Sequence, residues 1–530
     1  MTQTRRDFIR NSAMLAAAFA TPFGAAHAQD RVKLFKWVPH ADLSVVDPMF
    51  STSYITQIYS MMVFDTLFGL DENYEAQLQM AGSHEVSEDR LTHVITLRDG
   101  LTFHDGAAVT AEDCVSSIKR WMARSGLAKS LVPVTASVEA TDTKTITFTL
   151  TEPFPLLTML LARPQSGCAI MPASEANSEE RLDRPTGSGP YKMVWDEWVL
   201  GSKIVFVRHD DYVPRPNEAP ARFNAGAKIA MIDRIEWQIV PDAATAIAAI
   251  QSNEVDGVES VSTDFAPIIE MLPTVELFRS EVPTAGVMRF NQLHPPFNDP
   301  KVRQAVLLAT DQRDFMAAAV GADNTASYNA ETGVFAPGTP MASTRGLEAI
   351  TGPRDLEKAR EMLKDAGVFG SQITVVDTVA ITTLHTFALV GIDLFKKLGF
   401  DVKIETLDWG ATLQKREVKA APAEGGWNVI FTAMVGVNNL DPIGQLAFRA
   451  TGESGWFGWP KSEKIESLRD AWMLAETQDA RIELAAQIQE EVFLEVPYVP
   501  LGSIYGLTAM TSQWSGYQPQ MANFYTLRSA

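Results

Sequence analysis

The spacing of apolar residues predicts three helices in this chain. Apolar positions recur every three or four residues within residues 109–122, 298–309 and 353–367, as expected for helices with one buried face. Thr110 begins the first stretch with a capping-box pattern. Asp299 begins the second, directly before a proline that suits the first helical position. These helices are expected to pack against a core on one side only.

β-Branched runs between the helices predict strands. Residues 144–150 and 203–208 have this pattern and are bounded by turn residues. Residues 235–258 read as a strand, a helix and a second strand in close succession, as in a βαβ unit. No repeat, low-complexity tract or long linker interrupts the pattern. The chain is therefore predicted to be an α/β protein whose domains are joined by crossing strands.

Length and charge narrow the classes of function. The 530 residues exceed what one core usually organises, so two or three domains are expected. The formal net charge of -20 argues against binding to nucleic acid or to an anionic membrane, both of which require clustered basic residues.

The first 28 residues differ in composition from the rest. Arg5 and Arg6 precede an uncharged, alanine-rich stretch that ends in Ala-His-Ala at Ala28. This order of basic, apolar and small residues predicts a signal peptide cleaved after about Ala28. The arginine pair predicts the twin-arginine route, with an ordinary secretory signal as the alternative, and both lead to the periplasm. The apolar part is too short and too rich in alanine to be a good transmembrane helix.

Motifs for catalysis and for metal or cofactor binding are absent from the sequence. There is no HExxH, CxxC, GxSxG or phosphate-loop pattern, so neither a metal nor a cofactor is expected and the protein is not predicted to be an enzyme. The Gly-rich residues 185–191 are interpreted as a tight turn, and His104 beside Asp105 as part of another turn. The two cysteines, Cys114 and Cys168, cannot form a disulfide framework, and the sequence leaves open whether they pair.

Six segments, taken in order, resemble landmarks of the family 5 extracellular solute-binding proteins. They are residues 97–120, 185–192, 249–258, 289–311, 356–367 and 495–502. Members of this family are periplasmic components of dipeptide, oligopeptide and nickel ABC importers. The resemblance covers essentially the whole chain after the signal segment.

The resemblance implies an α/β, two-lobed periplasmic-binding-protein fold of type II, in the large form with an extra subdomain in lobe I. The implied division is a discontinuous lobe I of residues 29–280, including an extra subdomain at about 66–184, then lobe II at 281–496 and a C-terminal return to lobe I at 497–530. The chain is expected to cross between the lobes near Val282 and again near Tyr498.

The implied function is capture of a peptide-like or other small polar solute in the cleft between the lobes. A monomer would then deliver the solute to an ABC permease and ATPase complex at the inner membrane. Neither a cofactor nor a nucleic acid takes part in that function. The alternative is an exported enzyme or assembly factor built on the same fold, because a fold does not determine a function.

One position departs from the pattern of peptide-binding relatives. In the segment that matches residues 435–442, those relatives carry a carboxylate four residues before the proline, which pairs with the peptide's α-ammonium group. That position here is Asn438, and with its neighbour Asn439 it is a candidate ligand contact. An amide offers a donor and an acceptor but no charge, so unmodified di- and tripeptides are expected to bind weakly. Asp408 could supply the missing charge from elsewhere.

Aromatic residues supply the other candidate ligand contacts. Trp456 and Trp459 lie in a Gly-flanked segment, and Trp427 and Trp409 lie in the same predicted lobe. Tyr54 follows an early loop that lies near the cleft in relatives. Simple packing within the lobes is the alternative for all five.

Overall fold

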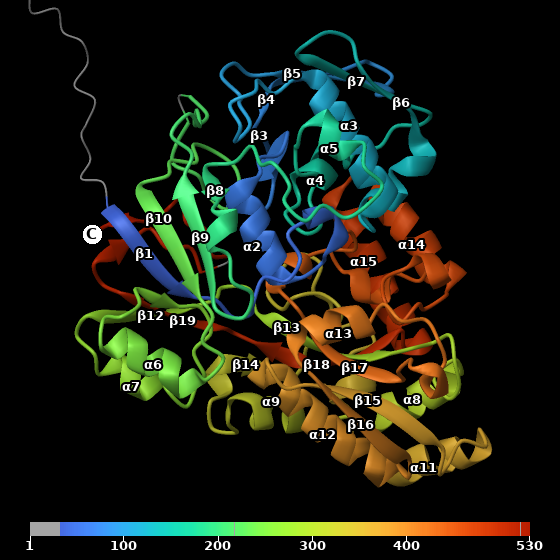
Figure 1. Cartoon of the computed structure of the whole chain (residues 1–530). Coiled ribbons are helices and arrows are strands. Elements are labelled where there is room, and N and C mark those ends of the chain that lie inside the picture. The colour runs from blue at the N-terminus through green and yellow to red at the C-terminus, as the bar shows by residue number, and fades with distance from the viewer. Residues whose placement is uncertain (1–31, 217, 520) are drawn as a thin grey trace, which may run out of the picture.

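The computed structural model describes residues 32–216, 218–519 and 521–530, so the predicted signal segment lies outside the described residues. A seven-stranded sheet organises the first part of the chain, with the strand order β12-β19-β11-β1-β10-β9-β8 (Figure 1). Its strands are β1 (Val32–Val38), β8 (Tyr191–Met193), β9 (Lys203–Arg208), β10 (Ile232–Gln238), β11 (Gly257–Val258), β12 (Val275–Arg279) and β19 (Leu507–Thr511).

A six-stranded sheet organises the second part, with the order β14-β18-β13-β17-β15-β16. Its strands are β13 (Thr284–Phe290), β14 (Tyr328–Asn329), β15 (Gln372–Thr378), β16 (Asp401–Leu407), β17 (Val429–Met434) and β18 (Tyr498–Ile504). We call the parts built around the seven-stranded and six-stranded sheets lobe I and lobe II.

The chain passes between the two sheets twice. The first passage, residues 280–283 between β12 and β13, includes the predicted position at Val282. The second lies at residues 505–506 between β18 and β19, beyond the predicted position near Tyr498. Tyr498 instead begins a strand that pairs with β13, and this pairing keeps the buried apolar run of β18 inside lobe II.

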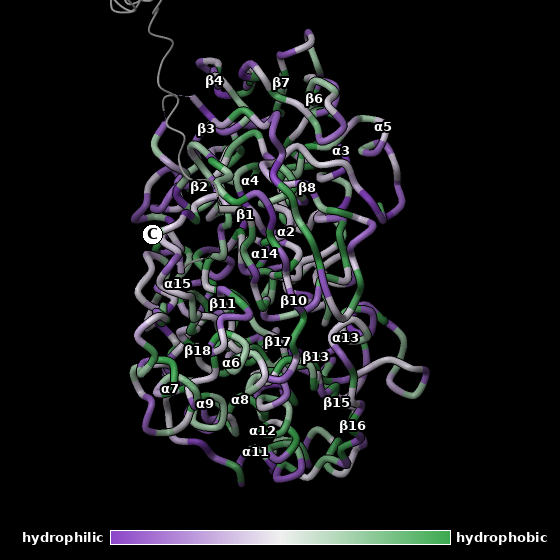
Figure 2. Tube along the Cα trace, turned by 60° about the vertical axis from the view of Figure 1, so that its left-hand side comes forward, coloured by the Kyte–Doolittle hydropathy of each residue, from purple (hydrophilic) through white to green (hydrophobic). Residues whose placement is uncertain are grey.

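A small four-stranded sheet forms a separate layer of lobe I, with the order β4-β5-β7-β6. Figure 2 shows this layer at one end of the molecule, the strands β1 and β10 in the middle, and β15 and β16 at the opposite end. Its strands are β4 (Ala81–Val86), β5 (Thr92–Leu97), β6 (Thr135–Ala140) and β7 (Thr145–Leu150), and a hairpin of β2 (Phe68–Leu70) and β3 (Ala76–Leu78) precedes them. We call this layer the small subdomain.

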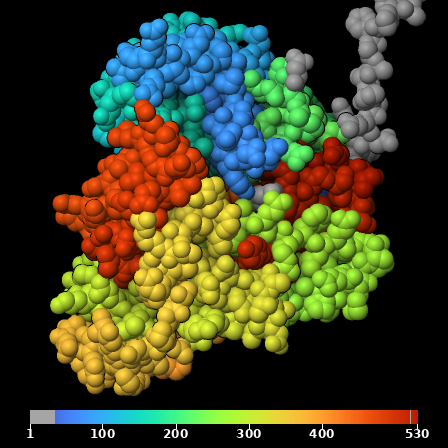
Figure 3. All heavy atoms as spheres, turned by 180° about the vertical axis from the view of Figure 1, so that it is seen from behind, coloured from blue at the N-terminus to red at the C-terminus, as the bar shows by residue number. Residues whose placement is uncertain are grey.

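Helices cover the sheets and fill the space between them. In lobe I they are α2 (Tyr54–Val63), α3 (Ala111–Arg124), α4 (Leu157–Ala162), α5 (Ala173–Ala176), α6 (Ala243–Gln251) and α7 (Ala266–Glu270). In lobe II they are α8 (Pro300–Ala309), α9 (Gln312–Val320), α10 (Glu348–Thr351), α11 (Leu356–Asp365), α12 (Thr382–Leu398), α13 (Trp409–Lys415), α14 (Glu463–Leu474) and α15 (Gln478–Glu495). The orange-red region in Figure 3, which includes α14 and α15, lies against both the blue small subdomain and the yellow part of lobe II.

The local predictions for helices and strands are confirmed. The three predicted helices are α3, α8 and α11, and the predicted strands are β7 and β9. The Thr110 side chain accepts a hydrogen bond from the Asp113 backbone N–H, which completes the predicted capping box of α3. Asp299 caps α8 through the Lys301 N–H. The βαβ unit is also present, with β10 and β11 lying parallel to β1 on its two sides.

The Gly-rich turn is required by close packing. A Cβ on Gly187 would lie 2.0 Å from the Val63 carbonyl oxygen, at the end of α2, and a Cβ on Gly189 would lie 2.6 Å from that of Met62. His104 Nε2 lies 3.0 Å from the Gly189 carbonyl oxygen in the same turn. These glycines therefore allow the turn to approach α2 closely, as interpreted from the sequence.

Candidate ligand-binding site between the two lobes

The loop that follows β17 contacts the first helix of lobe I. Asn438 is 4% exposed, and its Nδ2–H donates to Gln57 Oε1 on α2 at 3.1 Å. Gln57 lies one helical turn after Tyr54, so both side chains leave the same face of α2. Asn438 therefore places an amide at this contact, where it meets a second amide from the other lobe.

Thr52, just before α2, makes a second set of contacts between the lobes. Its Oγ1 accepts hydrogen bonds from Trp456 Nε1–H at 3.2 Å and from Arg416 Nη2–H at 3.3 Å. The Arg416 guanidinium also lies over the Phe457 ring, 4.9 Å from its centroid. Burial lowers the pKa of Arg416. Of the predicted tryptophans, Trp456 is thus the one that directly reaches lobe I through a hydrogen bond.

An ion pair forms the third contact between the lobes. Arg163, at the end of α4 in lobe I, pairs with Asp441, and its Nη1–H donates to the Val437 carbonyl oxygen at 3.4 Å. The Arg163 side chain is 2% exposed. Asp441 also accepts the backbone N–H groups of Ile443 and Gly444. The loop of residues 435–445 is therefore held both internally and against lobe I.

Asn439 is directed toward lobe II. Its backbone oxygen accepts a hydrogen bond from Ala336 N–H at 2.8 Å, and its Oδ1 accepts one from Gln445. Among the described residues, no hydrogen-bond partner reaches its buried Nδ2. Although adjacent in sequence, Asn438 and Asn439 thus meet different neighbours.

Trp427 and Trp459 lie in the core of lobe II. Their rings are 5.9 Å apart between centroids, and they pack with Val376, Ile430 and Phe457. Trp427 is 0% exposed and Trp459 is 3% exposed. This burial favours the packing alternative, and direct ligand contact by either residue stays a prediction.

Asp408 and Trp409 mark the start of α13. Asp408 is exposed, and its Oδ1 accepts the Ala411 N–H at 2.8 Å as a helix cap. Trp409 is partly buried against the core of lobe II. Because this oxygen of Asp408 caps the helix, we do not propose that Asp408 supplies the negative charge that Asn438 lacks.

Tyr54 belongs to a polar cluster in lobe I that includes two residues the sequence analysis missed. Its ring lies 5.1 Å from the His40 ring. Glu259 Oε2 accepts the His40 backbone N–H at 2.9 Å and lies 2.8 Å from His40 Nδ1. His40 follows β1 and Glu259 follows β11, so the two residues are brought together by strand pairing across more than 200 positions in the chain.

Four of the residues that join the lobes, Thr52, Gln57, Arg163 and Arg416, were also missed. Only Gln57 carried a usable sequence signal, its spacing of three residues from Tyr54 on one helix. The other three lie in turns or at helix ends, and their contacts depend on how distant segments meet.

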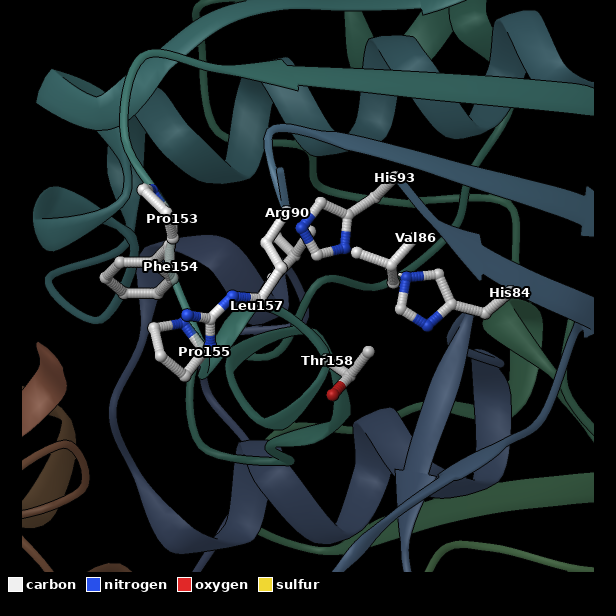
Figure 4. A pocket seen from close by; sticks show the side chains of 9 residues that line it. All are labelled: His84, Val86, Arg90, His93, Pro153, Phe154, Pro155, Leu157 and Thr158. Atoms are coloured by element: carbon white, nitrogen blue, oxygen red, sulfur yellow. Dashed lines mark hydrogen bonds between the residues drawn. The ribbon is translucent and has the colours of Figure 1, made fainter. Parts of the chain in front are cut away.

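Another cavity, of about 250 Å³, lies in the small subdomain (Figure 4). His84 Nε2 and His93 Nδ1 lie 3.0 Å apart at its wall. Burial lowers the pKa of both histidines. Within the described residues there is no cluster of three or more His, Cys, Asp or Glu side chains suited to a metal ion. No described helix is both long and apolar enough to span a bilayer.

Comparisons with known proteins agree with this architecture. A probable peptide ABC transporter periplasmic-binding protein of Sinorhizobium fredii is 32% identical over 98% of both chains. A glutathione-binding protein of Escherichia coli is 24% identical over 93% of both chains.

Solved structures share the fold at low sequence identity. A Helicobacter pylori periplasmic binding protein in complex with the peptide STSA has a TM-score of 0.79 and 23% identity, and the match covers 94% of this chain and 98% of that one. An Agrobacterium binding protein in complex with agropinic acid has a TM-score of 0.78 and 20% identity, covering 94% and 99%. These structures establish the two-lobed α/β fold for this chain.

The model of the bacterial extracellular solute-binding proteins, family 5, matches residues 75–455. That match spans the small subdomain and most of lobe II, including the loop that carries Asn438. Because of this match and the full-length similarity to the Sinorhizobium protein, the chain belongs to the family 5 bacterial extracellular solute-binding proteins.

Proposed function

We propose that this protein captures a peptide-like or other small polar solute between its two lobes and delivers it to an inner-membrane permease and ATPase complex. As a family 5 protein, it serves as the substrate-binding component of an ABC importer. The observation that carries the proposal is a group of three contacts between the lobes, Thr52 with Trp456, Gln57 with Asn438, and Arg163 with Asp441.

The mechanism follows from the two chain passages. Lobe I, from residue 29 to about 280 with the C-terminal return, and lobe II, from about 281, rotate about residues 280–283 and 505–506. A solute shifts the protein toward the closed form only by the difference in its affinity for the closed and open forms. The three contacts between the lobes contribute to that closed form and exclude water from the bound solute.

The preferred solute presents a neutral polar group to Asn438. A buried ammonium group at this position would lack a carboxylate partner, and burying an unpaired charge is costly. Hydroxyl, amide or N-blocked groups can use both the donor and the acceptor of an amide. Replacement of Asn438 by alanine removes both, and we expect it to weaken binding of the preferred solute.

The test is a thermal-shift screen of peptides, oligosaccharides, opines and metal chelates, followed by small-angle scattering with the best binder. The radius of gyration is expected to fall on binding, and the solute is expected to be recovered unchanged. An unchanged radius with a tightly bound solute, or chemical conversion of the solute, would contradict the proposed mechanism.

The cellular location follows from the first 28 residues. We propose that they are a twin-arginine signal and that the mature, periplasmic protein begins near Gln29. N-terminal sequencing of the exported protein tests this assignment, and an uncleaved cytoplasmic product would overturn it.

A further inference from the structure

A carboxylate lies at the edge of the seven-stranded sheet that faces lobe II. The parallel strands β1 and β11 pair Trp37 with Gly257 and Val38 with Val258, so both strands end at the same edge. His40 and Glu259 follow these ends. Thr52 and Thr263 are near these two residues in the chain, and both hydrogen-bond lobe II, Thr263 through the Val320 carbonyl oxygen at 2.9 Å. The carboxylate is therefore placed at the side of lobe I where the lobes meet.

Glu259 is held in place with one oxygen uncommitted. Its side chain is 8% exposed, and His40 contacts Oε2 alone, through its backbone N–H and Nδ1. Across residues 32–216, 218–519 and 521–530, no hydrogen bond reaches Oε1 and no lysine or arginine pairs with this carboxylate. Oε1 is not among the fully buried unpaired atoms, so a cationic group of a solute can reach it.

Two phenol rings lie within electrostatic range of the same carboxylate. Burial raises the pKa of Tyr54 and of Tyr517, and the negative charge of Glu259 raises both further. Tyr517 donates its O–H to Thr508 Oγ1 at 3.1 Å, and Thr508 donates in turn to the Glu259 backbone oxygen at 2.9 Å. The ring of Tyr54 is also beside His40. Residues from four other chain segments thus lie around Glu259.

Tyrosine rings near a carboxylate suit an organic cation. A cation gains from the electron-rich faces of tyrosine rings and from a charge-assisted hydrogen bond to the carboxylate. We propose that His40, Tyr54, Glu259 and Tyr517 form a subsite for an alkylammonium or guanidinium group of the bound solute. The inference rests on the proposed function, and it assigns the charged end of the solute to lobe I and a neutral end to Asn438 in lobe II.

A purely structural role is the competing explanation, in which Glu259 only ties the segment after β1 to the end of β11. The two roles differ in their effect on selectivity. A structural pair would affect all solutes alike, whereas a cation subsite affects only solutes that carry the cation.

The experiment uses a probe pair that differs by one charge. N-acetyl-Ala-Lys carries its only cation on the lysine side chain, and the same dipeptide acetylated on Nζ carries none. Calorimetry on the full mature chain is expected to show at least about tenfold tighter binding of the charged probe. Glu259→Gln should reduce this ratio to about one. Glu254→Gln, at an exposed position, should leave it unchanged.

Further variants and outcomes separate this inference from the proposed function. Glu259→Asp keeps the charge and should retain part of the preference, and thermal unfolding of each variant checks that it is folded. Tyr54→Leu should weaken the charged probe several-fold more than the neutral one. If the wild type shows no preference, or binds neither probe below 1 mM, the inference is overturned. Closure around a neutral solute would then still support the proposed function.

Discussion

Replacing Asn438 by aspartate should convert the protein into a receptor for free α-amines. The substitution removes the Nδ2–H that donates to Gln57 Oε1 and places a carboxylate oxygen opposite that Gln57 oxygen. Gln57 could donate to this carboxylate oxygen only by rotating its amide, and it would then lose the hydrogen bond from its Nε2–H to the Thr52 carbonyl oxygen, at 3.2 Å. The ligand-free variant therefore carries a poorly paired carboxylate at a site that is 4% exposed.

Two magnitudes follow from this geometry. Loss of the amide hydrogen bond and burial of the new carboxyl should lower the free energy of unfolding by about 1–3 kcal/mol. A peptide ammonium that reaches this carboxylate regains a charge-assisted hydrogen bond worth about 1.5–3 kcal/mol, or about 10- to 150-fold in affinity. Burial raises the pKa of the new carboxyl, so this gain should be lost as the pH falls below that raised pKa.

The assay is calorimetry at neutral pH with Ala-Ala and N-acetyl-Ala-Ala. The wild type is expected to bind N-acetyl-Ala-Ala at least as tightly as Ala-Ala, whereas Asn438→Asp should bind the free amine at least about ten times more tightly than the acetylated probe. Asn439→Asp is the matched control, because Asn439 is also buried but faces Gln445 inside lobe II. A wild type that already binds the free amine ten times more tightly, or a folded Asn438→Asp variant without selectivity, would refute the reasoning.

Three further predictions concern closure and stability. Arg163→Met should weaken solute binding by tenfold or more, because the ion pair with Asp441 is proposed to form only when the lobes close, so its loss destabilises the closed form alone. An unchanged affinity by calorimetry would show that the pair is not part of closure. Gly187→Ala should destabilise the fold by at least about 1–3 kcal/mol in urea unfolding, because its Cβ would lie 2.0 Å from the Val63 carbonyl oxygen. Burial lowers the pKa of His104 to about 3, whereas in the unfolded chain this histidine binds a proton once the pH falls below about 6.5. Protons therefore favour the unfolded state, and the free energy of unfolding should decrease as the pH falls from about 6.5 to 3. Urea unfolding of His104→Asn should show a less steep decrease.

Local structure and family could be predicted from the sequence, because their signals lie within short stretches of chain. The capping pattern at Thr110 predicted the start of α3, and Asp299 before a proline predicted the start of α8. The glycines of residues 185–191 predicted a tight turn, and the structure adds that α2 is the element they approach. Six landmarks in order indicated the family, and the comparisons confirm it.

The side chains of the candidate site were harder to predict. Tryptophans look alike in a sequence, yet Trp427 is enclosed in the core of lobe II whereas Trp456 hydrogen-bonds Thr52 in lobe I. A strand such as Tyr498–Ile504 is equally apolar whether it crosses between the lobes or ends inside one, so its pairing with β13 could only be seen in three dimensions.

By itself, therefore, the sequence determined several of the helices and strands, a tight turn, the family and the presence of an amide at position 438. Only the tertiary structure decided which groups meet across the lobes and that no hydrogen bond from the described residues reaches Glu259 Oε1. Capping, periodicity and turn chemistry act over a few residues, and the sequence records them directly. The contact of His40 with Glu259 spans 219 positions and depends on the pairing of β1 with β11, so no local pattern could encode it.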